Sequence, residues 1–271
     1  MKLKEAIKLL SSAGVPEAEY DARALFRYVG KVSMPITADC ECPDDIISDA
    51  IQRRAEREPL QYIIGEVGFY RETYKVSEDC LIPRSDTEIL VEFAEKNIPK
   101  GESFIDFCSG SGCVAISTLK NTDNTRAIAL DISDGALNIA KENARVNGVS
   151  DRLRFIKCDV LGNLPSEVTE EKFYALLSNP PYVREKDYEA LEDEIYHEPR
   201  IAFVGGEDGL EFYRRLIPLT LSIVKDEGFS AFEIGFDQAD DMRRIAKELG
   251  LTAQIIKDYS GNDRVAIFKR A

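Results

Sequence analysis

The sequence has few basic residues for its length. Its 271 residues include 35 lysines and arginines against 49 aspartates and glutamates, which gives a formal net charge of −14. A protein that holds duplex DNA by neutralising its phosphates needs a basic face. The charge balance therefore argues against nucleic acid as a stably bound partner.

Long apolar runs are also missing. No stretch approaches the roughly 20 apolar residues of a membrane-spanning helix. The chain opens with Met1-Lys2-Leu3-Lys4-Glu5, which begins an amphipathic helical pattern rather than a signal peptide. We therefore expect a soluble, cytoplasmic protein with no membrane partner, and nothing in the sequence requires more than a monomer.

Metal-binding spacings are absent as well. None of the six cysteines forms a C-x-x-C pair, and Cys40 and Cys42 are separated only by Glu41. The single histidine, His197, has no obvious nucleophile beside it. We predict free thiols in a reducing compartment, no metal site, and no covalent enzyme intermediate.

What the chain does contain divides into three parts. Residues 1–58 show helical periodicity in three pieces, separated by Pro16, Pro35 and Pro43, and predict a small helical domain. Residues 59–80 are rich in aromatic and β-branched residues interrupted by Gly65 and Gly68, and predict a β-hairpin linker. Residues 81–271 form the third part. The apolar content of the whole chain, 44%, is enough for a sizeable core.

Short apolar strands alternate with helices in the third part. The predicted strands are 104–107, 127–130, 153–156, 173–177, 229–234, 253–256 and 265–268. Helical stretches separate the first five, so these strands are expected to be parallel. A turn signal at 260–263 separates the last two, which predicts an antiparallel hairpin at the edge. The fold class is therefore α/β, with a mostly parallel seven-stranded sheet.

A helix is expected to begin near residue 85. Ser85 and Glu88 have the spacing of a capping box, and Ile89, Leu90 and Phe93 follow on one helical face. We expect this helix start to be the main role of the segment.

The segment Ser178-Asn179-Pro180-Pro181-Tyr182 follows the fourth predicted strand directly. Ligands bind at the carboxyl ends of strands in open α/β sheets. Two prolines stiffen the loop and remove backbone donors, so the Asn179 amide and the free carbonyls can accept hydrogen bonds from an NH2 group. Tyr182 adds an aromatic face. The segment predicts a clamp for an amide or amino nitrogen.

A glycine-containing loop follows the first predicted strand. Gly110-x-Gly112-x-x-Ala115, with Asp131 ending the second strand, also matches the dinucleotide-binding pattern, so the loop by itself is ambiguous. Asp131 is suited to ribose hydroxyls in either case. Asp106, just before the loop, would repel a pyrophosphate but suits the cationic methionine end of S-adenosylmethionine. Asp159, after the third strand, is placed to accept from an adenine amino group.

The sequence resembles the release factor glutamine methyltransferases of the HemK/PrmC type over nearly its whole length. The matching blocks are 59–65, 81–88, the glycine loop, 178–183, and 198–209. The resemblance implies a Rossmann-like, S-adenosylmethionine-dependent methyltransferase domain preceded by a helical domain that docks release factors. It also implies methylation of the glutamine side-chain nitrogen N5 in a Gly-Gly-Gln motif, with S-adenosylhomocysteine as product.

The resemblance also implies site residues. Cofactor contacts fall on Cys108, Ser109, Gly110, Ser111, Gly112, Asp131, Asp159, Val160 and Asn179, with Asp106 beside them, and glutamine contacts fall on Asn179, Pro180, Pro181 and Tyr182. Asn179, Pro180 and Tyr182 are the predicted catalytic residues, and Arg84 is a further candidate for orienting substrate. Cys108 departs from the family, which usually has glycine there.

The sequence leaves three hypotheses for the function of the protein. The first is methylation of a release factor glutamine by direct in-line transfer. The second is methylation of an exocyclic amine on DNA or RNA, against which the acidic charge counts. The third is a nucleotide-binding module without enzymatic activity, in which the helical domain serves only interaction.

Overall fold

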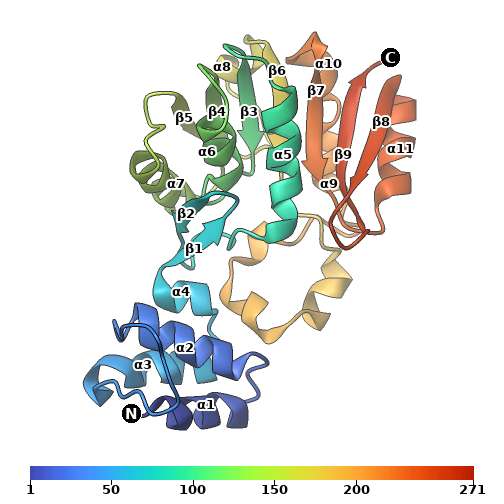
Figure 1. The fold of residues 1–271 in the computed structure, drawn as a ribbon. Helices are drawn as coiled ribbons and strands as arrows, with labels where there is room; N and C mark the ends of the chain where they lie inside the picture. Colours follow the sequence, from blue (N-terminus) through green and yellow to red (C-terminus); the bar gives the residue numbers. More distant parts are fainter. The chain divides into compact units, whose positions relative to one another are not determined.

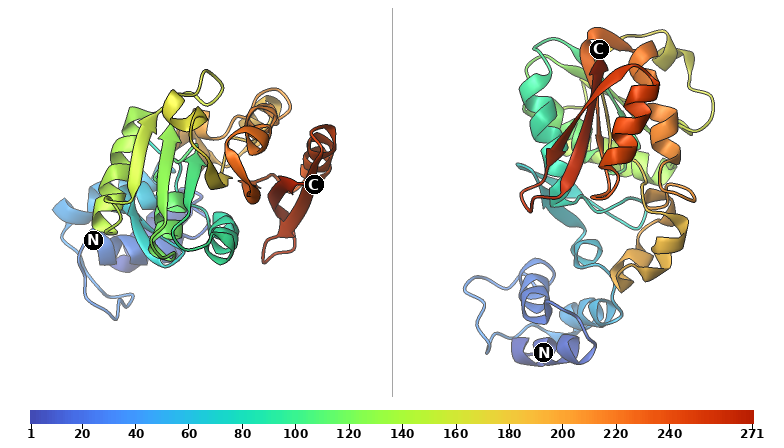
Figure 2. Two further views of the ribbon diagram at one scale, coloured as in Figure 1. Left: turned by 90° about the horizontal axis from the view of Figure 1, so that it is seen from above. Right: turned by 90° about the vertical axis from the view of Figure 1, so that its right-hand side faces the viewer.

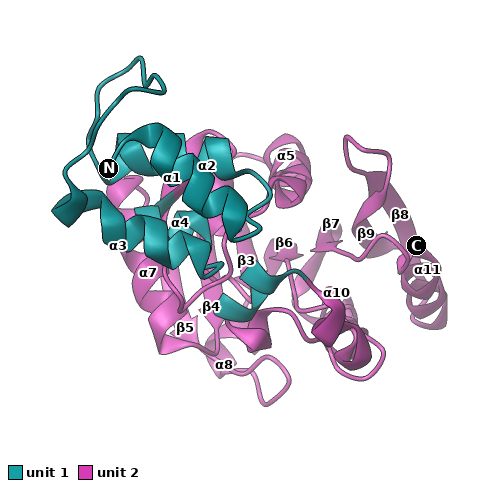
Figure 3. Cartoon of the chain, turned by 90° about the horizontal axis from the view of Figure 1, so that it is seen from below, with its two compact units in different colours: residues 1–66, 192–198 teal, residues 67–191, 199–271 magenta.

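The computed structural model describes all 271 residues, which form two compact units (Figure 3). Unit 1 comprises Met1–Glu66 together with Glu192–Glu198. Unit 2 comprises Val67–Leu191 and Pro199–Ala271. None of the helices combines the length and the apolar composition that crossing a membrane requires.

Unit 1 contains the three helices that the periodicity predicts. They are α1 (Leu3–Ser12), α2 (Ala18–Tyr28) and α3 (Asp44–Ala55). Their apolar residues recur every three to four positions, which places them on one face of each helix. Leu10, Leu25, Phe26 and Ile47 are among the residues buried where these faces meet.

A fourth helix corrects the prediction for residues 59–80. Leu60–Ile64 form α4, and the hairpin is limited to β1 (Glu66–Phe69) and β2 (Glu72–Lys75). Gly65 ends α4 in the left-handed conformation, with φ +86°, which favours glycine. Leu60 and Ile63 pack into the core of unit 1. Burial of one helical face therefore outweighs the β propensity of this short run.

The segment Glu192–Glu198 contacts the rest of unit 1 through partly buried ion pairs. It contains the 3-10 helix η3 (Asp193–His197). Arg54 Nη2 lies 2.9 Å from Glu194 Oε1, and Arg57 Nη2 lies 2.6 Å from Glu194 Oε2. Arg54 Nε also contacts Asp21 Oδ2, at 2.7 Å. Burial disfavours the charged form of Glu194, but the hydrogen bonds from Arg57 and Arg54 outweigh it and lower its pKa to about 2.

Unit 2 is built on a seven-stranded sheet in the order β5-β4-β3-β6-β7-β9-β8 (Figure 1). The strands are β3 (Ser103–Phe107), β4 (Arg126–Asp131), β5 (Leu153–Lys157), β6 (Phe173–Ser178), β7 (Val224–Glu233), β8 (Leu251–Lys257) and β9 (Asp263–Arg270). The first five are parallel, and β9 is antiparallel to both β7 and β8. All seven predicted strands and the edge hairpin are confirmed.

Helices cover both faces of this sheet (Figure 2). One core contains side chains of α5 (Glu88–Asn97), α6 (Cys113–Lys120), α7 (Asp134–Val146) and the small hairpin. The opposite core contains side chains of α8 (Ser166–Thr169), α9 (Glu211–Leu216), α10 (Leu219–Ser222) and α11 (Ala239–Glu248). The short 3-10 helices η2 (Glu185–Ala190) and η4 (Arg200–Ala202) lie in the long connection from β6 to α9.

The predicted capping box is wrong. Residues Ser85–Thr87 form the 3-10 helix η1, which leads into α5 at Glu88, and no side chain caps either start. Glu88 Oε1 instead accepts a hydrogen bond from the backbone N–H of Tyr70, at 2.7 Å. Glu88 is therefore engaged by the hairpin, which the local spacing does not reveal.

Candidate active site

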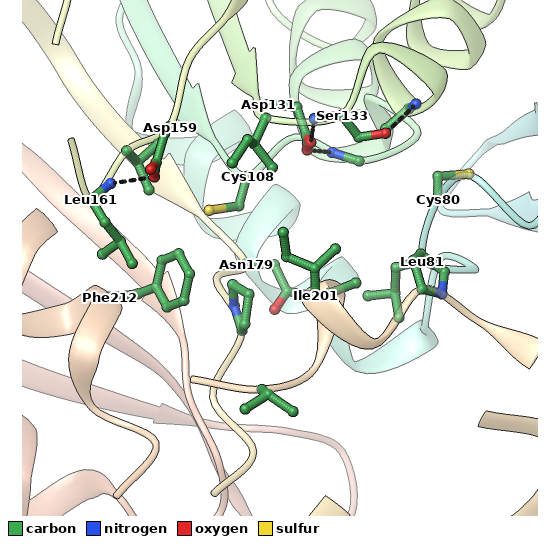
Figure 4. Close-up of a pocket in the computed structure, with 18 of the residues that line it drawn as sticks. Cys80, Leu81, Cys108, Asp131, Ser133, Asp159, Leu161, Asn179, Ile201 and Phe212 are labelled. Atoms are coloured by element: carbon green, nitrogen blue, oxygen red, sulfur yellow. Dashed lines mark hydrogen bonds between the residues drawn. The ribbon is translucent and has the colours of Figure 1, made fainter. Parts of the chain in front are cut away.

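The carboxyl ends of β3, β4, β5 and β6 lie at one edge of the sheet, because these strands are parallel and in register. The loops that follow them line a cavity of about 350 Å³ (Figure 4). Its polar side chains include Asp131, Asp159 and Asn179, and Leu81, Ile201 and Phe212 add apolar walls. The cavity thus has the mixture of apolar surface and few polar groups that is typical of small-molecule sites.

The glycine loop, residues 108–112, connects β3 to α6 at this edge of the sheet. Gly112, at φ +80°, is tightly packed, because an added Cβ would lie 3.0 Å from Ile116 Cδ1 and 3.1 Å from Ala140 Cβ on α7. Gly110 and Cys108 also have positive φ, of +52° and +57°. Cys108 lines the cavity in a conformation that a non-glycine residue adopts only at a cost.

Asp131 and Asp159 hold the loops after β4 and β5. Asp131 Oδ2 accepts from the Gly110 N–H at 2.8 Å, and Oδ1 accepts from the Ser133 N–H at 2.9 Å. Burial raises the pKa of Asp131. Asp159 Oδ1 accepts from the Leu161 N–H at 2.9 Å, and Val160 lines the cavity beside it. Figure 4 shows both carboxylates at the cavity wall.

A second cavity, of about 40 Å³, shares Asn179 and Cys108 with the larger one. It is lined by Arg84, Thr87, Asp106, Ser109 and Ser111, among others, whereas Gly112 lines neither cavity. Asp106 Oδ2 accepts from the Ala115 N–H at 3.2 Å, and burial raises its pKa well above the ordinary value. Asp106 therefore fixes the start of α6 as well as lining the small cavity.

The Asn-Pro-Pro-Tyr segment is only partly directed at the cavities. Asn179 lines both of them and Pro181 lines the larger, but Pro180 and Tyr182 line neither. The Tyr182 ring packs against the core, and its hydroxyl donates to Glu233 Oε1 at 3.2 Å. The aromatic face that the sequence suggests for a ligand is thus turned to the sheet.

Two residues behind Asn179 receive no role from the sequence. Asn179 Nδ2 donates to Thr87 Oγ1 at 3.1 Å, and Thr87 Oγ1 donates to Glu233 Oε2 at 2.5 Å. Thr87 and Glu233 are separated by 146 residues. The one available signal is that Glu233 is a lone acid within the apolar run 229–234 of a buried strand, since a buried charge needs partners.

Comparison with known proteins gives the family. The PrmC N-terminal domain family matches residues 2–65, and the methyltransferase small domain family matches residues 84–206. The release factor glutamine methyltransferase of Aquifex aeolicus is 34% identical, covering 100% of this chain and 96% of its own. The release factor glutamine methyltransferase of Fusobacterium nucleatum is 36% identical, and the match covers 98% of this chain and 77% of that protein. The chain belongs to the release factor glutamine methyltransferase family.

A solved structure supports the fold of this family member. The ribosomal protein L11 methylase of Lactobacillus delbrueckii has a TM-score of 0.53 and 20% sequence identity, over 72% of this chain and 83% of that one. This likeness confirms the Rossmann-like methyltransferase fold, and the relatives confirm the resemblance that the sequence motifs predict.

Membership of this family implies S-adenosylmethionine as the methyl donor, and the two cavities fit it. Asp131 and Asp159 offer carboxylate oxygens to hydroxyl and amino donors, between apolar walls. Ser109 Oγ is buried beside the small cavity and has no hydrogen-bond partner. Buried hydroxyls are normally satisfied, so this orphaned group fits a polar ligand end.

Proposed function

We propose that this protein methylates the side-chain nitrogen N5 of the glutamine in the Gly-Gly-Gln motif of peptide chain release factors. The observation that carries the proposal is the position of Asn179, which lines both cavities at the edge that also holds Asp131 and Asp159. Relatives that match 98–100% of the chain are named release factor glutamine methyltransferases, which supports the proposal.

An amide nitrogen is a poor nucleophile because its lone pair is delocalised into the carbonyl. The task of the site is therefore orientation. The Asn179 side-chain oxygen and the Pro180 carbonyl are the two acceptors that would hold the N–H groups of the glutamine NH2. Holding the nitrogen in this way directs its lone pair, and orientation can lower a barrier by several kcal/mol, up to about 7 to 11 in the most favourable cases.

S-adenosylmethionine supplies an electrophilic methyl group on a positively charged sulfur. Asp131, Asp159, Val160 and the loop 108–112 are the residues that would hold it, together with Asp106 and Ser109 beside the small cavity. The S–CH3 bond would break as the N–CH3 bond forms, and the Asn179 and Pro180 oxygens would stabilise the positive charge that develops on the amide nitrogen until it loses a proton to water. Direct transfer needs neither a metal nor a covalent enzyme intermediate, and Arg84 would help to orient the substrate.

Unit 1 would dock the release factor, with the acidic surface attracting a basic partner. A cytoplasmic monomer that holds no nucleic acid stably is consistent with this role, and with the net charge of −14.

The test is methyl transfer from labelled S-adenosylmethionine to four acceptors: a release factor, the same factor with its Gly-Gly-Gln glutamine changed to alanine, DNA, and RNA. We expect label on the unmodified factor alone. Equal label on the alanine form would refute the glutamine assignment, and label on nucleic acid alone would favour an exocyclic amine.

A further inference from the structure

Behind Asn179 lies a chain of hydrogen bonds that ends on a buried carboxylate. Asn179 Nδ2 lies 3.1 Å from Thr87 Oγ1, which lies 2.5 Å from Glu233 Oε2. Glu233 Oε1 accepts from the Tyr182 hydroxyl at 3.2 Å. Thr87 and Glu233 are both 2% exposed, so water does not compete for the bond between them.

The sheet places this chain where it can act on the site. Ser178, the last residue of β6, is paired with Phe232 of β7, and the residues that follow this pair are Asn179, just past β6, and Glu233, the last residue of β7. The β7–β9 pairing brings Val265 opposite Glu233. Thr87 lies in η1 and reaches both residues from outside the sheet. The chain therefore joins η1, β7 and the segment that follows β6, directly behind the predicted clamp.

The direction of each hydrogen bond follows from the charge at its end. An ionised carboxylate can only accept, so Thr87 must donate its single hydroxyl proton to Glu233. The Thr87 oxygen can then only accept from Asn179, and within that side-chain amide only the NH2 group can donate. The Asn179 oxygen is left on the opposite side of the amide, free to accept from a ligand.

We propose that Glu233 is a positioning residue which, through Thr87, fixes the orientation of the Asn179 amide so that its oxygen accepts from the substrate NH2 group. The inference rests on the proposed function of Asn179. Glu233 touches no substrate in this arrangement. Its charge sets which end of the Asn179 amide the substrate meets.

Protonation of Glu233 would reverse the chain. A neutral carboxyl can donate to Thr87, whose proton is then available to the Asn179 oxygen, and the amide would present its NH2 group to the substrate NH2 group. Two donors would face each other. Methyl transfer should therefore be slow when Glu233 is protonated, at low pH, and fast when it is ionised, at high pH.

The groups around Glu233 set the pH at which its carboxylate is protonated. Burial raises its pKa to about 7, against the hydrogen bonds from Thr87 and Tyr182 and the positive charge of Arg264. The ionisable groups that face it are Asp86 from η1, Cys113 from α6, Tyr182 after β6, Tyr213 from α9 and Arg264 from β9. Arg264 is itself paired with Asp86 and Asp258.

Two substitutions of Thr87 form a matched pair. Thr87→Val keeps the shape but removes the hydroxyl, and Thr87→Ser keeps the hydroxyl. Loss of one buried hydrogen bond should lower kcat for release factor methylation at pH 8 by about tenfold or more in Thr87→Val. The KM and the affinity for S-adenosylhomocysteine should change by less than about threefold, and Thr87→Ser should restore most of the rate. Equal rates in the two variants would overturn the proposal.

The pH profile gives a second measurement, and it uses a variant that keeps the size of the side chain. The kcat of the unmodified enzyme should rise through a step near pH 7, and Glu233→Gln, which carries no charge, should show no such step. A step that persists in Glu233→Gln belongs to another group and contradicts the proposal. Thermal unfolding of every variant identifies any that fails to fold, and the remaining variants still decide the question.

A readout without substrate separates this inference from the proposed function. One side-chain N–H of Asn179 should exchange slowly with solvent in NMR spectra of the unmodified protein at pH 8, and rapidly in Thr87→Val. If the unmodified enzyme transfers no methyl group to release factors, the proposed function fails while this measurement still tests the hydrogen-bond chain. Fast exchange of both protons in the unmodified protein would refute the chain.

Discussion

At the scale of single residues, Asn179 and Asp131 have separable tasks. Asn179→Ala removes an acceptor aimed at the reacting nitrogen and should lower kcat by about a hundredfold or more, as removal of one preorganised group does elsewhere. Its affinity for S-adenosylhomocysteine, measured by calorimetry, should change much less.

Asp131→Ala provides the reciprocal comparison. Asp131 holds the backbone N–H groups of Gly110 and Ser133 and lines the larger cavity, so its removal should chiefly weaken cofactor binding. If Asn179→Ala lost cofactor affinity as severely as Asp131→Ala, the clamp role of Asn179 would have to be abandoned.

The left-handed backbone conformation of Cys108 should lower the stability of the protein. A side chain at φ +57° costs about 1–2 kcal/mol relative to an ordinary conformation, and glycine avoids this cost but loses more backbone entropy on folding. Cys108→Gly should therefore raise the free energy of unfolding in urea by up to about 1 kcal/mol. Cys108→Ala is the control, because it removes the thiol and keeps the Cβ. Stabilisation by both variants would attribute the effect to the thiol instead of the backbone.

At the scale of elements, the start of α5 depends on the hairpin. Glu88→Ala removes the acceptor for the Tyr70 N–H and should lower the free energy of unfolding by about 1–2 kcal/mol. Ser85→Ala should change it by less than about 0.5 kcal/mol, since Ser85 is exposed and caps nothing. A larger loss of unfolding free energy in Ser85→Ala than in Glu88→Ala would instead support the predicted capping box.

The elements differ in how well the sequence predicts them. Strands of the parallel sheet are buried on both faces, so they appear as continuous apolar runs with helices between them. The run Leu60–Ile64 is equally apolar, but a short run does not distinguish strand from helix, and burial against unit 1 decides.

The site shows the same division. Its loops follow the strand ends and could be predicted, as could the position of Asn179. The hydrogen-bond chain through Thr87 and Glu233 could not, because it joins residues 146 positions apart that leave no local pattern. The orientation of the Tyr182 ring is likewise a result of packing, which its neighbours in the sequence do not specify.

At the scale of the whole molecule, Glu194 should make stability depend on pH. Its pKa is about 2 in the folded protein, below the ordinary value of 4.5. The stabilisation is therefore fully present above about pH 4.5 and is lost as the pH falls towards 2. Glu194→Ala should lower the free energy of unfolding in urea at pH 7 by about 2 kcal/mol. The loss is limited because Arg54 keeps Asp21 as a partner.

Urea unfolding at several pH values checks this linkage. The difference between Glu194→Ala and the unmodified protein should shrink below pH 4.5. Glu192→Ala is a suitable control, because Glu192 lies in the same segment and is exposed. A difference that stays constant down to pH 3 would show that the charge of Glu194 is not the source of the stabilisation.

The assignment of Glu192–Glu198 to unit 1 has a consequence for modularity. The polypeptide passes from one unit to the other at three points, after residues 66, 191 and 198. A single proteolytic cut near residue 66 would break the covalent link to residues 1–66 but leave Glu192–Glu198, a part of unit 1, in the larger fragment. A chain shortened to residues 67–271 would retain Glu194 but lose Arg54 and Arg57, its partners. Residues 1–66 are thus not an exchangeable module by themselves, and grafting them onto another methyltransferase domain would also require inserting the Glu192–Glu198 segment into the interior of the recipient's sequence.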